Sequence, residues 1–217
     1  MVGRFWWLNK NMAITDYHKK HINRSDEETN RRIFVKELEL KKILSETNYK
    51  PSFENVRVAV FGCADKRFVK RHKLIFEKLF QKPVELITFD ISIEHLEGEE
   101  NVVQHDITTP IPNAPFDITF GHVVLKFIET NKQWGVIKNA YNALRSPGLG
   151  IFVFDLEDVT TQNPIQADGY FSLPIETYKQ KLTEENIKFE DLRWDINLDD
   201  VPISIRGLKG GALVIEK

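Results

Sequence analysis

Cysteine is nearly absent from this chain of 217 residues, which contains a single thiol, Cys63. One thiol excludes an internal disulfide bond and a zinc site built from several cysteines. Long apolar runs are also missing, because the amino-terminal run from Phe5 to Leu8 is too short for a signal-peptide core or a membrane-spanning helix. We therefore predict a cytoplasmic protein, in keeping with a reducing compartment.

An excess of charge of either sign is missing as well. The chain has 30 Lys and Arg residues against 32 Asp and Glu residues, so its formal net charge is −2. No global field favours nucleic acid or an anionic membrane, and we expect neither DNA nor a membrane as a partner. His95, His105 and His122 lack the tight spacing of metal ligands, so we predict no metal.

The chain divides into an amino-terminal helical extension, residues 1–53, and a main domain, residues 54–217. Ser25 and Glu28 form a capping box, and the apolar stripe that follows predicts a helix to about Glu46. Three aromatic residues near the amino terminus must be covered by other parts of a protein, namely Phe5, Trp6 and Trp7. They dock on the domain, dock on a protein partner, or belong to a helix that the sequence does not place.

Strands alternate with helices in the main domain. The expected strands are 56–61, 84–89, 101–104, 116–122, 149–155, 189–197 and 211–216. Helices are expected near 66–81 and 131–144, and from Pro174 to about Ile187. This order predicts an α/β fold with a doubly wound, mostly parallel seven-stranded sheet. The last two strands have no helix between them, so they should form an antiparallel edge hairpin.

Chemistry-bearing residues fall where these strands end. They are Gly62–Arg67, Asp90, Asp106, Gly121–His122 and Asp155–Asp158. Ligands of doubly wound sheets bind at the carboxyl ends of the strands, where a tight turn lets the backbone approach and an acid accepts from ribose hydroxyls. The pattern predicts a nucleoside site with an acidic rim, which suits a positively charged tail better than a pyrophosphate. The long segment from Leu156 to Phe171 follows the same edge and is either a substrate-gating loop or disordered.

Five segments together resemble the class I S-adenosylmethionine-dependent methyltransferases over about residues 54–217. They are VAVFGCADKRF, LITFDIS, VVQHDITTPIP, FDITFGHVVLKFI and ALRSPGLGIFVFD, in this order. The resemblance implies a Rossmann-like methyltransferase fold, S-adenosylmethionine as cofactor, and methyl transfer to an unidentified acceptor, with a small molecule favoured.

The same resemblance implies the residues of the site. The donor would be bound by Gly62, Cys63, Ala64, Asp65, Asp90, Ile91, Asp106, Ile107 and Gly121. Asp90 would bind the ribose and Asp106 would lie near the adenine amine, although Asp106 could equally initiate a turn unaided. His122 is the candidate catalytic residue beside the acceptor; it would act as a base or only line a loop. Cys63 is best interpreted as a small packed thiol.

The first crossover loop departs from the pattern of the family. Val60 stands where the family has an acid, and Ala64 and Lys66 replace two glycines. Lys66 is the more serious change, because a residue with a Cβ atom disfavours positive φ. These departures support a second hypothesis, a catalytically inactive methyltransferase-like binding or scaffold protein. A nucleotide-binding oxidoreductase is a third, which the missing glycines and the acidic rim disfavour.

Overall fold

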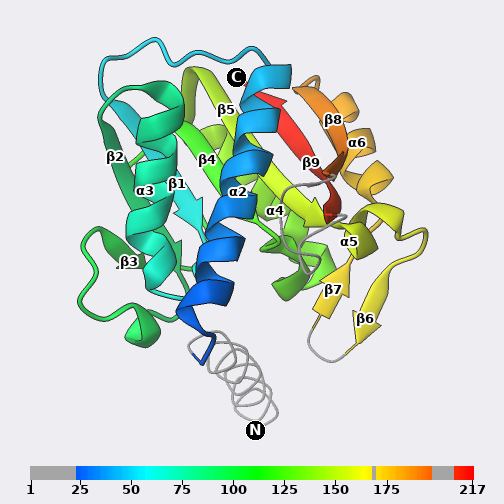
Figure 1. Cartoon of the computed structure of the whole chain (residues 1–217). Helices are drawn as coiled ribbons and strands as arrows, with labels where there is room; N and C mark the ends of the chain where they lie inside the picture. Colours follow the sequence, from blue (N-terminus) through cyan, green and yellow to red (C-terminus); the bar gives the residue numbers. More distant parts are fainter. Residues whose placement is uncertain (1–22, 168–169, 197–207) are drawn as a thin grey trace, which may run out of the picture.

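The structure is a computed structural model that describes residues 23–167, 170–196 and 208–217 (Figure 1). The aromatic residues near the amino terminus, for which a cover was expected, lie outside these residues. The described residues form a seven-stranded sheet in the order β3-β2-β1-β4-β5-β9-β8. Its strands are β1 Val56–Phe61, β2 Val84–Asp90, β3 Val102–Gln104, β4 Phe116–His122, β5 Leu144–Asp155, β8 Lys188–Ile196 and β9 Leu208–Glu216.

The pairing of these strands confirms the predicted topology. Strands β1 to β5 are parallel to their neighbours, whereas β9 runs antiparallel to both β5 and β8. The order reverses beside β1, which therefore places the switch point between β1 and β4. The carboxyl ends of β1, β2 and β4 meet at one edge of the sheet, and this edge carries the candidate site.

Helices cover both faces of the sheet. Helices α2 (Asp26–Glu46) and α3 (Arg67–Phe80) lie side by side on one face, with α4 (Thr130–Ala143) on the opposite face (Figure 1). Helix α6 (Ile175–Glu184) packs on the same side as α4. Successive side chains of a strand point to opposite faces. Thus Val58 and Val60 pack with α2 and α3, while Ala59 and Phe61 pack with α4 and α6.

Local signals set the helix ends close to where the sequence predicted them. The Oγ atom of Ser25 accepts a hydrogen bond from the backbone N–H of Glu28 at 3.1 Å, so Ser25 caps α2. Helix α3 ends at Gln81, which adopts a left-handed conformation with φ 53°. Lys66, at the start of α3, has φ −55° and ψ −29°. The prediction of backbone strain at Lys66 was therefore wrong, because Lys66 adopts ordinary helical angles.

The segment after β5, for which a substrate-gating loop or disorder was expected, contains regular secondary structure. It contains a short helix, α5 (Leu156–Thr160), and two strands, β6 (Ile165–Ala167) and β7 (Tyr170–Ser172), which pair with each other antiparallel. Two short 3-10 helices, Glu94–Leu96 and Leu125–Phe127, follow β2 and β4.

Helix α2 belongs to the same core as the sheet. Leu40 and Ile43 are fully buried and pack in the cluster that holds Val58 and Val60 of β1. Within the described part of the chain, no helix combines the length and apolar character needed to cross a membrane.

Candidate functional site

The turn after β1 brings its backbone close to the end of β4. Gly62 has φ +76°, a left-handed conformation that glycine adopts without steric cost. Its N–H donates to the carbonyl of Phe89 on β2 at 2.8 Å. A Cβ atom added to Gly62 would lie only 3.2 Å from the Cγ2 atom of Val124, just beyond β4. The turn is therefore a glycine-dependent close approach, which is the kind of backbone that a nucleoside site requires.

Asp90, at the end of β2, holds this turn by its carboxylate. One oxygen accepts from the N–H of Cys63 at 2.7 Å and the other from the N–H of Ser92 at 3.1 Å. Asp90 is 6% exposed, and burial raises its pKa while the two N–H bonds oppose that effect. An ionised carboxylate offers about four acceptor positions. The bonds from Cys63 and Ser92 therefore do not exhaust the acceptor capacity of the Asp90 carboxylate.

Two apolar side chains and a second acid lie near Asp90. Ile91 is 47% exposed although it follows a buried strand, whereas Ile107 is buried. The exposed acid Asp106 accepts from the N–H of Thr108 at 3.0 Å, so it does initiate a turn, as one of the two interpretations had it. An exposed apolar side chain beside a buried acceptor is an arrangement that a ligand with a flat apolar face and a hydroxyl group would satisfy.

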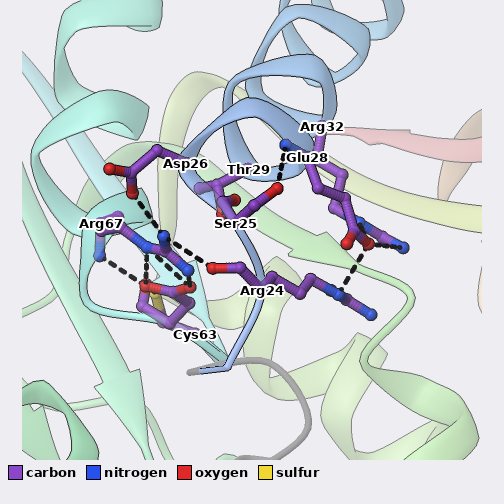
Figure 2. Close-up of polar contacts among 9 residues, drawn as sticks. Arg24, Ser25, Asp26, Glu28, Thr29, Arg32, Cys63 and Arg67 are labelled. Carbon is purple, nitrogen blue, oxygen red and sulfur yellow. Dashed lines mark hydrogen bonds and ion pairs between the residues drawn. The ribbon is translucent and has the colours of Figure 1, made fainter.

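Asp65 is engaged by the neighbouring cation Arg67, which Figure 2 shows beside Asp26 and Arg24. Asp65 is 3% exposed, and its carboxylate binds the Nε atom of Arg67 at 3.0 Å and the Nη2 atom at 2.5 Å. Arg67 also donates to the carboxylate of Asp26 at 2.7 Å and to the carbonyl of Arg24 at 3.1 Å. A contact of Asp65 with a ligand would therefore use its backbone. The same contacts fasten the start of α2 to the first crossover loop.

Cys63 is a packed thiol in this loop. It is 4% exposed, and burial raises the pKa of its thiol to about 12. Its carbonyl oxygen lies 2.6 Å from the Nε2 atom of His95. Because thiolate is the nucleophilic form, a buried thiol of this kind is inert. The neighbouring Ala64 is partly exposed and has no positive φ, so its side chain is accommodated without strain.

His122 ends β4 at the level of the crossover loop. Gly121 is the register partner of Phe61, which places His122 level with Gly62. The Nε2 atom of His122 lies 2.9 Å from the Oε2 atom of Glu39 on α2. Burial and then the charge of Lys36 lower the pKa of His122, and Glu39 opposes them.

The backbone beyond His122 is strained. Val123 has φ +55°, which is an outlier for a β-branched residue. Its N–H donates to the carbonyl of Val153 on β5 at 2.9 Å, which holds the strained turn in place. A Cβ atom on Gly121 would approach the Cγ1 atom of Val124 to 2.8 Å. Strain of this kind persists where the surrounding structure enforces it, and it clusters at functional sites.

Two residues of α2 were not predicted from the sequence. Lys36 places its ammonium 5.1 Å from the ring centre of Phe68 and 6.0 Å from that of Phe120, and burial lowers its pKa to about 8. Glu39 is 7% exposed. The sequence did contain a signal for the burial of Glu39, because Glu39 lies one helical turn before Ile43 and thus on the apolar stripe of the helix.

The rim is less acidic than the sequence suggested. At the end of β5, the Nζ atom of Lys126 lies 2.7 Å from Asp155 and 3.6 Å from Asp158. Ser172 donates to Asp158 at 2.6 Å. Burial raises the pKa of Asp158. Asp155 is half-buried, which alone would raise its pKa, but the hydrogen bond from Lys126 and other contacts lower it overall. Asp65 is likewise paired. Among the described residues, no cluster of three or more potential ligands gathers around a metal position.

Comparison with solved structures gives the same architecture. The N-methyltransferase NodS from Bradyrhizobium japonicum, in complex with S-adenosylhomocysteine, superposes with a TM-score of 0.59 at 17% identity, covering 96% of this chain and 98% of NodS. The 1,6-didemethyltoxoflavin-N1-methyltransferase from Burkholderia thailandensis, with its substrate and S-adenosylhomocysteine bound, has a TM-score of 0.59 at 12% identity, covering 99% of this chain and 89% of its own. The chain has the Rossmann-like methyltransferase fold.

A third structure agrees, an S-adenosylmethionine-dependent methyltransferase from Clostridium acetobutylicum with a TM-score of 0.54 at 11% identity, covering 95% of this chain and 98% of that one. No protein-family model matches the chain, and a search of curated proteins finds no match either. At sequence identities this low, the superpositions show the fold alone, and an activity has to be argued from the site.

Proposed function

We propose that the protein is an S-adenosylmethionine-dependent methyltransferase that acts on a small-molecule acceptor. The observation that carries the proposal is the carboxylate of Asp90, which lies at the ligand edge of the sheet, accepts from the crossover loop and has acceptor capacity beyond its bonds to Cys63 and Ser92. Two of the three neighbours described above were solved with S-adenosylhomocysteine, the demethylated product of this donor.

The residues of the first crossover loop fit such a donor despite their departures from the family pattern. Gly62 supplies the left-handed turn, and Lys66 needs no unusual backbone angles. Val60, which replaces an acid, is 1% exposed and packs in the core, so no unpaired carboxylate is buried there. The loop therefore retains a left-handed glycine turn directly after β1, which supports the proposal although two glycines of the family pattern are replaced.

In this proposal each residue has a defined role toward the donor. The backbone of the loop would contact the amino-acid part through Gly62, Cys63, Ala64 and Asp65, with Gly121 behind it. Asp90 would accept from the ribose hydroxyls, Ile91 and Ile107 would contact the base, and Asp106 would lie near its amine. When bound, the donor supplies a methyl group on a positively charged sulfur.

Positioning accounts for much of the expected catalysis. Holding the acceptor in line with the methyl group removes a large entropic part of the barrier, so no catalytic triad is required. His122 lies level with the crossover loop, and we propose that it faces the acceptor.

The test is the thermal stability of the purified protein with S-adenosylmethionine, S-adenosylhomocysteine or NAD. A ligand at 100 times its dissociation constant adds about 2.7 kcal/mol to the free energy of unfolding. For a chain of this size the melting temperature should rise by about 5–11 °C. A rise with the two adenosyl compounds and none with NAD supports the proposal; an unchanged melting temperature with both adenosyl compounds refutes it.

One observation favours the second candidate, a catalytically inactive binding or scaffold protein. The acids and the thiol around the loop are almost fully covered, with Cys63, Asp65 and Asp90 exposed by 4%, 3% and 6%. Asp65 is also occupied by Arg67, which binds Asp26 at the same time. A protein that has lost its donor would have no need for an open loop, and the thermal test above separates the two candidates.

A further inference from the structure

We propose that Glu39 positions His122 as the general base for an acceptor that loses a proton, namely a hydroxyl group or an amine. The inference rests on the proposed methyltransferase function and names the acceptor class of that site. It adds a residue from α2 to a site that is otherwise built from the loops at the edge of the sheet.

The contact between the two side chains defines which ring nitrogen is free. The carboxylate of Glu39 can only accept, so the Nε2 atom of His122, 2.9 Å away, carries the proton. A neutral ring then leaves Nδ1 unprotonated and able to accept. Glu39 is 7% exposed and is fixed in α2 beside the fully buried Leu40, so the ring is held in one orientation.

The charges around His122 keep its ring neutral. From α2, Lys36 disfavours the protonated ring and Glu39 favours it. From α3, His72 interacts with the same ring, and from β5, Asp155 favours the protonated form. Burial and Lys36 outweigh the two acids, so the pKa of His122 lies below its ordinary value and the ring is an available base at neutral pH.

His122 is also in the right place along the sheet. It lies level with Gly62 across the pair of β1 and β4, at the switch point where ligands of this fold bind. The strained Val123 follows it, and Val124 closes against Gly62. The base and the proposed donor loop therefore share one short stretch of the sheet edge.

The proposed step conserves atoms and electrons. The electron pair of the acceptor oxygen or nitrogen forms the bond to the methyl carbon, and the methyl–sulfur bond breaks with its electron pair left on sulfur. The proton of the acceptor goes to Nδ1 of His122 and then to water. A carboxylate acceptor carries no proton at neutral pH and would not need the base.

The first experiment measures the protonation state and the tautomer of the His122 ring. Nitrogen-15 NMR of the full chain should show His122 as the neutral Nε2–H tautomer at pH 7. In Glu39→Gln the tautomer preference should weaken. Glu37→Gln removes another carboxylate of α2, which pairs with Lys78 of α3, and should leave the preference unchanged. An Nδ1–H tautomer, or a protonated ring at pH 7, would overturn the proposal whatever the activity.

The second experiment measures transfer to three probes, namely catechol, benzylamine and benzoate, together with donor affinity by calorimetry. His122→Gln should lower transfer to catechol or benzylamine by about 10²- to 10⁴-fold with donor affinity unchanged, and should abolish its dependence on pH below 7. Glu39→Gln should lower the same rate, and Glu39→Asp should restore part of it.

The outcomes separate this inference from the proposed function. Absence of donor binding in the unmodified protein removes the proposed function. If the unmodified protein binds the donor, three results would overturn the general base and leave the donor site in place. They are equal transfer by the unmodified protein and His122→Gln, transfer to benzoate alone, and transfer to none of the three probes.

Discussion

Replacing Asp90 by asparagine tests whether the carboxylate that holds the crossover loop also binds the proposed donor. The carboxylate accepts from the N–H groups of Cys63 and Ser92. An amide of the same size has only one oxygen, so one of these N–H groups would face an NH₂ group. Loss of a hydrogen bond to a charged group costs about 1.5–3 kcal/mol. For this chain length, the melting temperature should fall by about 3–12 °C.

The same substitution should weaken donor binding. If the ribose loses one charged hydrogen bond of about 1.5–3 kcal/mol, affinity should fall by about 10- to 150-fold. Isothermal calorimetry with S-adenosylhomocysteine, at a temperature where the variant is folded, measures this change.

Asp117→Asn is the matched control for Asp90→Asn. Asp117 is a fully buried acid on β4 near its amino end, and it accepts from the N–H of Arg57 at 2.6 Å. It should lower stability while leaving donor affinity unchanged. Equal donor affinity in Asp90→Asn and the unmodified protein, or equal weakening by both variants, would refute the assigned role of Asp90.

Three further perturbations probe the fold and its charges. Arg145→Gln should lower the free energy of unfolding in urea by about 3–5 kcal/mol, because it leaves the buried carboxylate of Asp117 without its cation. The Oδ1 atom of Asp117 lies 2.6 Å from the Nε atom of Arg145. A loss below about 1 kcal/mol would contradict this. His72→Leu should raise stability by about 1–3 kcal/mol, since neither ring nitrogen of His72 has a hydrogen-bond partner among the described residues; a lower urea midpoint would point to a partner that the ring requires. Burial lowers the pKa of both His72 and His122 below 6.5, so the unfolded chain takes up protons that the folded chain does not. The free energy of unfolding should therefore be level above about pH 6.5 and fall below it by up to about 1.4 kcal/mol per pH unit for each ring, with a shallower fall in His72→Leu; equal pH profiles of the urea midpoint would count against the assignment.

Much of the fold could be predicted because local chemistry and the sheet agree. The cap at Ser25 and the apolar runs of the strands each follow from a short stretch of sequence. The expected strand 149–155 lies within β5, where the residues from 149 to 154 are all buried, as in a strand covered on both faces. The short helix and hairpin between Leu156 and Ser172 were missed, because their elements are three to five residues long and carry almost no periodicity.

The site could be predicted only where it follows the strand ends. The rule for doubly wound sheets gathers Gly62, Asp90 and His122 at one edge, since each directly follows or ends a strand. Glu39 reaches His122 across 83 positions of sequence, and no local pattern encodes that distance. Lys66 was misjudged for a different reason, because a lost glycine matters only where φ is positive, and sequence alone does not give φ.

Helix α2 makes the extension inseparable from the chemistry proposed for the sheet. A shortened protein that begins at residue 54 would expose to water the apolar face of β1 that Leu40 and Ile43 cover. It would also lack Glu39 and the anchor that Arg67 finds in Asp26. Shortened versions of this chain should therefore keep every residue from Arg24 onward.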